Sequence, residues 1–212
     1  ASKTPGKMHG CGHDGHTSML LGAAKYLSEN RNFNGTVHLI FQPAEEGGAG
    51  AIRMIKEGLF KEFPVDAIYG VHNWPGLPIG KVGLRSGPIM ASTNTFDIVI
   101  SGKGGHAAFP HLSKDPITAG AQMVSALQTI VSRQINPLDN AVISVTNFQS
   151  GSGASNVIPD TAKLIGTFRA FTPQTRTFIQ RRIEEIVTNI AAAFGCTATI
   201  EISDGYDPTI NT

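Results

Sequence analysis

The sequence TVHLIF, residues 36–41, is a continuous run of apolar and β-branched side chains around one histidine, His38. Such a run is typical of a strand buried on both faces of a parallel sheet, and it predicts that His38 is a core histidine. A helical pattern precedes the run at residues 17–30, with serine and threonine available as the N-cap, and another follows at residues 49–59. Two further short apolar runs, predicted to be strands, occupy residues 66–71 and 80–84. The alternation of helices and strands predicts an α/β layer architecture.

The pattern changes beyond residue 93. Phe96, Ile98 and Ile100 occupy alternate positions, as expected for one face of a strand. A helix, two strands at residues 141–148 and 162–171, a second helix and a strand at residues 197–202 follow. This is the split β-α-β order of a ferredoxin-like domain.

Both helices of this second part have clear boundary signals. Asp115-Pro116 and Thr172-Pro173 supply an N-cap followed by a proline, and Gly195 is placed to end the second helix. The apolar faces predicted to enter the core are Ile117, Ala121, Val124 and Ile130 in the first helix, and Ile179, Ile183, Ile186 and Ile190 in the second.

The composition is that of a globular chain. Of its 212 residues 41% are hydrophobic and 16% charged, which excludes intrinsic disorder, and no apolar run approaches the roughly 20 residues of a membrane span. A net charge of +1 gives no signature of nucleic-acid or lipid binding. We therefore expect no nucleic acid or membrane among the partners. Two distant cysteines, Cys11 and Cys196, and no signal segment ahead of the first motif favour a reducing cytoplasm.

The densest group of reactive side chains lies in MHGCGHDGHT, residues 8–17. Cys11 and His13, separated by one glycine, can project to the same side of an extended segment, and thiolate plus imidazole suits a borderline-soft divalent metal. Asp14 could orient His13 or cap the following helix, and we keep both alternatives. His9 and His16 are interpreted as ordinary loop histidines.

Two other groups follow predicted strands. Glu45 and Glu46 stand in FQPAEEGGAG, just after the run that ends at Phe41, and His72 stands in GVHNWPG. Since ligands of open α/β sheets bind beyond the carboxyl ends of the strands, we expect these side chains to meet Cys11 and His13 at one sheet edge.

Six motifs follow one another along the chain: MHGCGHDGHT, FQPAEEGGAGA, GVHNWPGLPIG, SGKGGHAAFPH, SNVIPD and GTFRAF. In this order they resemble the amidohydrolase branch of the co-catalytic metallopeptidases, which includes hippurate hydrolase, bacterial N-acyl-amino-acid amidohydrolases and plant hydrolases of indole-acetyl-amino acids. The resemblance implies an α/β, zinc-peptidase-like catalytic domain with an inserted ferredoxin-like α+β lid and dimerisation domain. On this basis residues 1–88 belong to the catalytic domain and residues 89–203 form the lid. Residues 204–212 are the start of the segment in which the chain returns to the catalytic domain.

The resemblance also implies two divalent metal ions, zinc, manganese, nickel or cobalt, and an N-acyl amino acid as substrate. Glu45 would be the general base, taking a proton from the attacking water and returning one to the leaving amine. His106 would steady the developing oxyanion in the partner subunit of a homodimer. The metal ligands would be Cys11, His13, Glu46 and His72. Asn156 would form a hydrogen bond with the substrate, and Arg169 would bind the substrate carboxylate. His111 is interpreted as an ordinary loop histidine.

The sequence departs from the family in two ways. Members carry a strand and an acidic motif upstream of the Cys-His loop, and a further metal-binding histidine near the carboxyl end. We therefore expect an incomplete catalytic domain, with truncation at both ends, and weak metal binding and little activity for this chain alone. Three alternatives remain open: a dipeptidase or carboxypeptidase of the same superfamily, a catalytically silent dimerisation or binding fragment, and a cysteine-based hydrolase.

Overall fold

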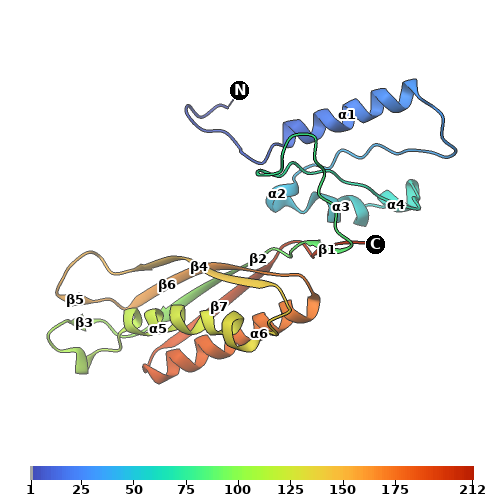
Figure 1. The fold of residues 1–212 in the computed structure, drawn as a ribbon. Helices are drawn as coiled ribbons and strands as arrows, with labels where there is room; N and C mark the ends of the chain where they lie inside the picture. Colours follow the sequence, from blue (N-terminus) through green and yellow to red (C-terminus); the bar gives the residue numbers. More distant parts are fainter. Residues whose placement is uncertain (1) are drawn as a thin grey trace. The chain divides into compact units, whose positions relative to one another are not determined.

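The computed structural model describes residues 2–212, and the chain divides into two compact units with the boundary between Gly83 and Leu84. The first unit is built from helices and extended segments (Figure 1). Its helices are α1 (His13–Glu29), α2 (Glu45–Gly48), α3 (Gly50–Lys56) and α4 (Leu59–Glu62).

The three strands predicted for this first unit are not formed. Among the described residues no strand precedes Gly87, and residues 36–41, 66–71 and 80–84 run without ladder hydrogen bonds. The side chains of Val37, Leu39 and Phe41 are 49%, 41% and 47% exposed. A buried parallel strand needs paired neighbours and covering helices on both faces, and these segments do not pair with one another.

His38 is correspondingly not a core histidine. Its ring is half-buried and packs against Phe63, with 5.3 Å between the ring centroids.

Helix α1 begins four residues earlier than predicted, at His13. Its N-cap is Gly12, with φ at 81°, so neither a serine, a threonine nor Asp14 caps it. Asp14 lies instead in the first turn, where a carboxylate interacts favourably with the helix dipole. The helix predicted over residues 49–59 is divided into α3 and α4 by Gly58, whose φ is 104°.

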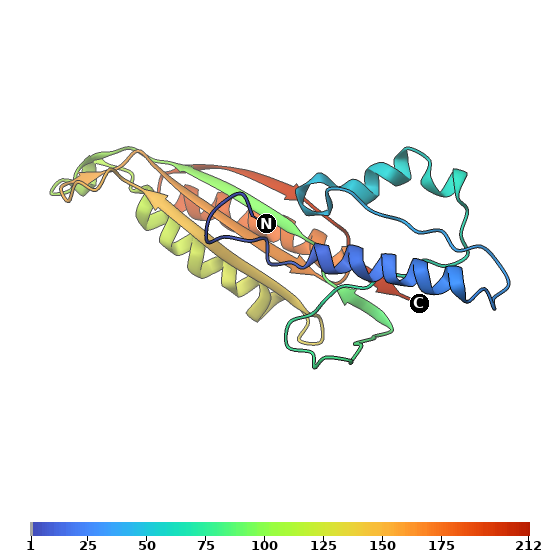
Figure 2. The ribbon, with the colours of Figure 1, turned by 90° about the horizontal axis from the view of Figure 1, so that it is seen from above.

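The second unit contains a four-stranded antiparallel sheet in the order β4-β6-β2-β7, with α5 and α6 on one face (Figures 1 and 2). Along the chain the order is β2, α5, β4, β6, α6, β7, as the sequence predicts. The bounds are β2 (Asn94–Ser101), α5 (Pro116–Thr129), β4 (Ala141–Ser150), β6 (Thr161–Ala170), α6 (Pro173–Ala193) and β7 (Thr197–Asp204).

Short elements complete this unit. β1 (Gly87–Met90) pairs with β8 (Thr209–Asn211), and β3 (Gly105–His106) pairs with β5 (Val157–Ile158), both antiparallel. A 3-10 turn, η1 (Pro110–Leu112), follows β3, and a π-helical turn, η2 (Ile130–Gln134), ends α5. No helix in residues 2–212 is long and apolar enough to cross a membrane.

The core lies between the sheet and its helices. Phe96, Ile98 and Ile100 are fully buried, which confirms the alternation read from the sequence. The predicted N-caps are also confirmed: Asp115 accepts hydrogen bonds from two backbone N–H groups of α5, and Thr172 accepts one from Thr175.

The predicted apolar face of α5 was wrong in its first half. Ile117 is 41% exposed and Ala121 is also exposed, whereas Ala119, Gly120 and Met123 are buried. A Cβ on Gly120 would lie 2.8 Å from the Phe148 ring, so this glycine lets the helix approach the sheet closely. The contact between α5 and the sheet is made in part by small residues. A search for large apolar residues at helical spacing therefore does not find this face. In α6, Ile179 and Ile183 are buried as predicted, and Ile186 and Ile190 pack at the core margin.

Candidate metal centre

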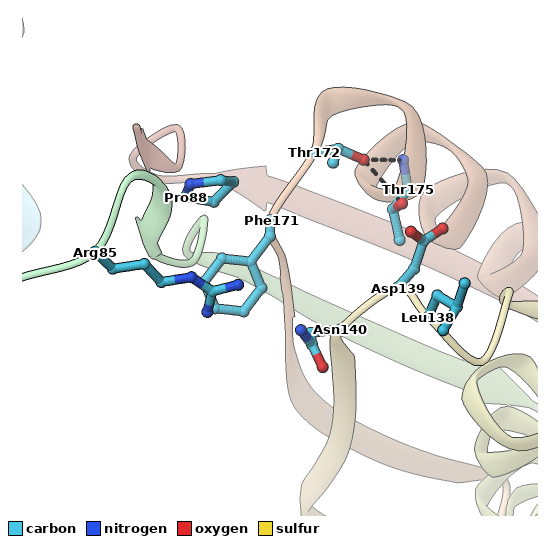
Figure 3. A pocket seen from close by; sticks show the side chains of 8 residues that line it. All are labelled: Arg85, Pro88, Leu138, Asp139, Asn140, Phe171, Thr172 and Thr175. Atoms are coloured by element: carbon cyan, nitrogen blue, oxygen red, sulfur yellow. Dashed lines mark hydrogen bonds between the residues drawn. The ribbon is translucent and has the colours of Figure 1, made fainter. Parts of the chain in front are cut away.

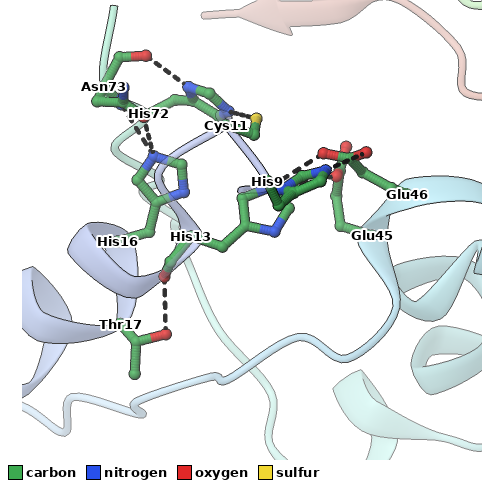
Figure 4. A network of polar contacts seen from close by, with 9 residues as sticks. All are labelled: His9, Cys11, His13, His16, Thr17, Glu45, Glu46, His72 and Asn73. Atoms are coloured by element: carbon green, nitrogen blue, oxygen red, sulfur yellow. Dashed lines mark hydrogen bonds and ion pairs between the residues drawn. The ribbon is translucent and has the colours of Figure 1, made fainter. Parts of the chain in front are cut away.

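Side chains of the types that can bind metals, from three segments of the first unit, meet in one cluster (Figure 4). Cys11 lies in the loop before α1 and His13 opens that helix. Glu45 and Glu46 come from α2, and His72 comes from the extended segment after α4. The sequence predicted that these side chains meet, although the sheet edge expected to hold them is not formed.

Cys11 and His72 form one side of the cluster. The Sγ of Cys11 lies 3.4 Å from Nε2 of His72, and Nδ1 of His72 donates to the backbone oxygen of Asn73 at 2.7 Å. Because Nδ1 carries the proton in that bond, the neutral ring presents the lone pair of Nε2 to the sulfur. Histidine ligands of metals are commonly fixed in this way.

His13 and the glutamates form the other side. Nε2 of His13 lies 3.4 Å from Oε1 of Glu46 and 3.7 Å from Oε2 of Glu45. The second oxygen of Glu46 lies 2.9 Å from Nε2 of His9. Glu46 is therefore held between two imidazoles.

Two histidines interpreted as ordinary loop residues belong to this network. His9 bonds Glu46, and Nε2 of His16 lies 2.6 Å from Oδ1 of Asn73. The signal that could have found them is the density of MHGCGHDGHT: helix α1 starts inside this motif, so its successive histidines turn toward one site. Asn73 gave no signal of its own beyond its place next to His72.

The backbone around the glutamates is unusual. Ala44 and Ala49, on either side of α2, have φ values of 48° and 49°, a region that alanine rarely occupies. Within α2, Glu46 has ψ at 108°, so the segment is a tight irregular turn rather than a regular helix. A Cβ on Gly50 would collide with the backbone oxygen of Pro43. Such strained backbone is found most often at functional sites, and here it occurs on both sides of the two glutamates.

The charges of the cluster act on one another. The hydrogen bond and charge of His9, with smaller effects of Cys11 and His13, lower the pKa of Glu46 despite its partial desolvation. Partial burial, the hydrogen bond and charge of Glu46, and the charge of Glu45 raise the pKa of the Cys11 thiol. Glu46 is therefore held as a carboxylate, whereas Cys11 is held as a neutral thiol until a cation offsets the negative charge.

The donor set fits divalent cations. The ligand atoms of Cys11, His13 and His72 lie within 4.8 Å of one another, as do those of His9, His13 and Glu46. Thiolate, imidazole and carboxylate together suit zinc and its neighbours among the transition metals. His13 belongs to both groups, so the two sets of ligands adjoin.

Comparison with known proteins assigns the chain to a family. All 212 residues match the model of peptidase family M20/M25/M40. The chain belongs to this family. It is 46% identical to the IAA-amino acid hydrolase ILR1-like 4 of Arabidopsis thaliana over 99% of this chain and 48% of that protein. It is 45% identical to an N-acyl-L-amino acid amidohydrolase of Geobacillus stearothermophilus over 100% of this chain and 57% of that protein.

The fold agrees as well. The structure matches a dinuclear metal-binding peptidase of the M20 family from Bacillus subtilis with a TM-score of 0.77 and 39% identity, covering 100% of this chain and 53% of that chain. The mixed α/β fold is thus that of M20 dinuclear metallopeptidases. The M20 chain described here spans about half the length of the curated relatives it matches.

The second unit of this M20 chain brings two other predicted site residues together. His106 lies on β3, and the N–H of Ala107 donates to the backbone oxygen of Asn156 at 2.9 Å. Nδ1 of His106 accepts the N–H of Ala108 at 3.1 Å. With Nδ1 as the acceptor, the proton of the neutral ring stands on Nε2, which makes Nε2 a hydrogen-bond donor.

Arg169 lies apart from this pair, on β6. Its Nη1 donates to the backbone oxygens of Asn94 and Phe168, at 3.1 Å and 3.0 Å, and to the hydroxyl of Thr167. All three hydrogen bonds are donated by the same nitrogen, Nη1, and they hold the guanidinium group in place. His111 lies in η1, with its ring centroid 6.3 Å from that of Phe109.

A pocket of about 160 Å³ in the second unit contains none of the predicted site residues (Figure 3). It is lined by Arg85, Asn140, Phe171 and the N-cap Thr172, among others. The Thr172 hydroxyl is engaged with Thr175, so this part of the wall belongs to the start of α6.

Proposed function

We propose that this chain is part of a metal-dependent amidohydrolase that cleaves the amide bond of N-acyl amino acids, releasing a carboxylate and a free amino acid. The observation that carries the proposal is that two groups of possible ligands, Cys11 with His72 and Glu46 with His9, adjoin each other through His13. The names of its relatives, an IAA-amino acid hydrolase and an N-acyl-L-amino acid amidohydrolase, support the same substrate class.

Cys11, His13, Glu46 and His72 would hold two divalent ions, of zinc, manganese, nickel or cobalt. Such ions supply a Lewis acid for the amide carbonyl and lower the pKa of water at the site. His9 stands against the oxygen of Glu46 that is turned away from His13, so it helps to keep this carboxylate in place.

Glu45 would act as the general base. Its neighbour Glu46 is engaged with His9 and His13, while Oε2 of Glu45 lies at the longer distance of 3.7 Å from His13. The carboxylate of Glu45 takes a proton from the attacking water and returns a proton to the leaving amine.

The second unit would supply the substrate contacts. The Nε2 proton of His106 suits a group that stabilises an oxyanion, and Asn156 beside it offers an amide for hydrogen bonding to substrate. Arg169, anchored through Nη1, retains other N–H donors on its guanidinium for a substrate carboxylate.

The architecture implied is a catalytic domain with an inserted lid at residues 89–203 that joins two subunits into a homodimer. The element order of this unit supports the inserted domain, and its edge strands β4 and β7 offer surfaces for pairing. Two unpaired cysteines support a reducing, cytoplasmic location.

The catalytic part would be completed by residues outside this chain. The exposed apolar segments of the first unit and the half-length match to relatives support this proposal. We accordingly expect weak metal binding and little turnover from the 212 residues alone, to be checked by elemental analysis of purified chain and intact protein side by side.

The proposed substrate class is tested with the intact protein and a panel of N-benzoylglycine, N-acetyl amino acids and unblocked dipeptides. Release of free amino acid from the N-acyl compounds is expected, with slower release when the substrate carboxylate is amidated. Cleavage of dipeptides alone would instead identify a dipeptidase, and no cleavage of any compound would favour a silent binding module.

A further inference from the structure

We propose that His16 and Asn73 are positioning residues that hold the His72 imidazole with its Nε2 lone pair directed at Cys11. The inference rests on the proposed metal site and adds two residues that are not ligands themselves. It explains why an asparagine and a further histidine lie beside the cluster.

The first link fixes His72. Its Nδ1 donates to the backbone oxygen of Asn73 at 2.7 Å, which leaves Nε2 unprotonated and 3.4 Å from Sγ of Cys11. The orientation of the ring therefore depends on where the Asn73 backbone is held.

The second link fixes Asn73. Nε2 of His16 lies 3.1 Å from the backbone nitrogen of Asn73 and 2.6 Å from its Oδ1. In one neutral tautomer Nε2 accepts the backbone N–H, and in the other it donates to Oδ1. Either tautomer ties His16 to Asn73.

The third link connects this pair to a rigid element. His16 is half-buried in α1, and its backbone N–H donates to the oxygen of Gly12 at 3.1 Å. Its ring lies against that of His72, with centroids 4.2 Å apart. A Cβ on Gly12 would lie 2.7 Å from Oδ1 of Asn73, so the loop that carries Cys11 also packs on this asparagine. The start of α1 thus sets the positions of Cys11, His13 and His72 together.

The test uses His16→Phe, which keeps a ring beside His72 but removes both ring nitrogens, and His16→Gln, which restores a polar group able to bond Asn73. Cobalt affinity of the intact metal-free protein is measured by chelator competition. The proton spectrum of the cobalt form is recorded as well, because the Nδ1 proton of each coordinated imidazole gives a shifted, exchangeable signal. His38→Phe, a histidine of the same unit outside the cluster, is the matched control.

We expect His16→Phe to weaken cobalt binding by about 10- to 100-fold, the usual effect of losing such support, and to lose the His72 Nδ1 signal through exchange. His16→Gln should regain most of the affinity, and His38→Phe should match the wild type. Far-UV circular dichroism monitors folding, and His16→Ala replaces the phenylalanine variant if that variant is unfolded.

Wild-type affinity in both His16 variants would overturn the positioning role, and so would equal weakening by phenylalanine and glutamine. Failure of the wild type itself to bind cobalt would contradict the proposed metal site instead. The two failures are therefore distinguishable.

Discussion

Glu45 and Glu46 are adjacent in sequence but have different surroundings, and this difference can be measured. Glu46 contacts His9 and His13, whereas Glu45 is assigned the proton transfer. We expect Glu45→Gln in the intact protein to lower kcat by about 10²- to 10⁴-fold, the range for a lost general base, while metal content stays at the wild-type level. Elemental analysis beside the rate assay checks both. Loss of metal in parallel with activity would show that Glu45 is a ligand instead.

The raised pKa of the Cys11 thiol predicts that this cysteine is slow to be alkylated. In the metal-free chain the neutral thiol should persist to higher pH than an ordinary cysteine, so alkylation by iodoacetamide near neutral pH should be slow. Glu46→Gln removes a hydrogen bond and a negative charge and should shift the pH profile of alkylation downward. Glu57→Gln, on an exposed glutamate paired with Arg53, is the control. A profile with a midpoint below that of a free cysteine would favour the cysteine-based hydrolase.

Several residue contacts could be predicted because one short motif contains them. Cys11 and His13 are two positions apart, so their proximity follows from the sequence itself. The glutamates were expected beside them because of a sheet edge that is not formed, so that meeting was predicted for a reason the structure does not support. The contacts of His16 with Asn73 could not be predicted in this way, because they depend on the helix beginning at His13 rather than several residues later. The catalytic and ligand roles of these residues stay predictions.

Among the elements, the helix caps of the second unit permit a quantitative test. Asp115 accepts the N–H of Ile117 at 2.9 Å and the hydroxyl of Thr118 at 2.7 Å. Asp115→Ala should lower the free energy of unfolding by about 1 kcal/mol, the usual value of an N-cap. Urea denaturation of the chain measures this. Ser125→Ala, at an exposed position within α5, should change stability by less than about 0.5 kcal/mol. Equal effects of the two substitutions would contradict the capping role.

The four strands of the main sheet were predicted from the sequence, whereas the short strands β1, β3, β5 and β8 were not, and the strands expected in the first unit are not formed. β2 pairs with β6 and β7 along its full length, so its alternation of apolar residues is matched by real neighbours. Residues 36–41 have an equally strong apolar pattern but no paired strand among residues 2–212. A local pattern of apolar residues shows that a segment is suited to a buried strand. The strand forms only when another segment pairs with it through backbone hydrogen bonds.

At the scale of the whole molecule, stability is concentrated in one unit. The buried apolar core residues, from Phe96 to Cys196, all belong to the second unit. In the 212-residue chain, amides of β2, β6 and α6 should exchange with solvent deuterium far more slowly than amides of residues 36–41 and 66–71. Hydrogen exchange followed by mass spectrometry tests this. Equal protection of the amides in both units would contradict the conclusion that the buried core lies in the second unit.

The central claim is that the cluster of the first unit holds the metal ions used in amide hydrolysis. The most direct measurement is the release of amino acid from an N-acyl amino acid by the intact protein before chelation, after verified metal removal and after metal is restored. We expect turnover to stop on removal and to return with zinc, manganese, nickel or cobalt. Hydrolysis at the untreated rate by verified metal-free protein would contradict the claim.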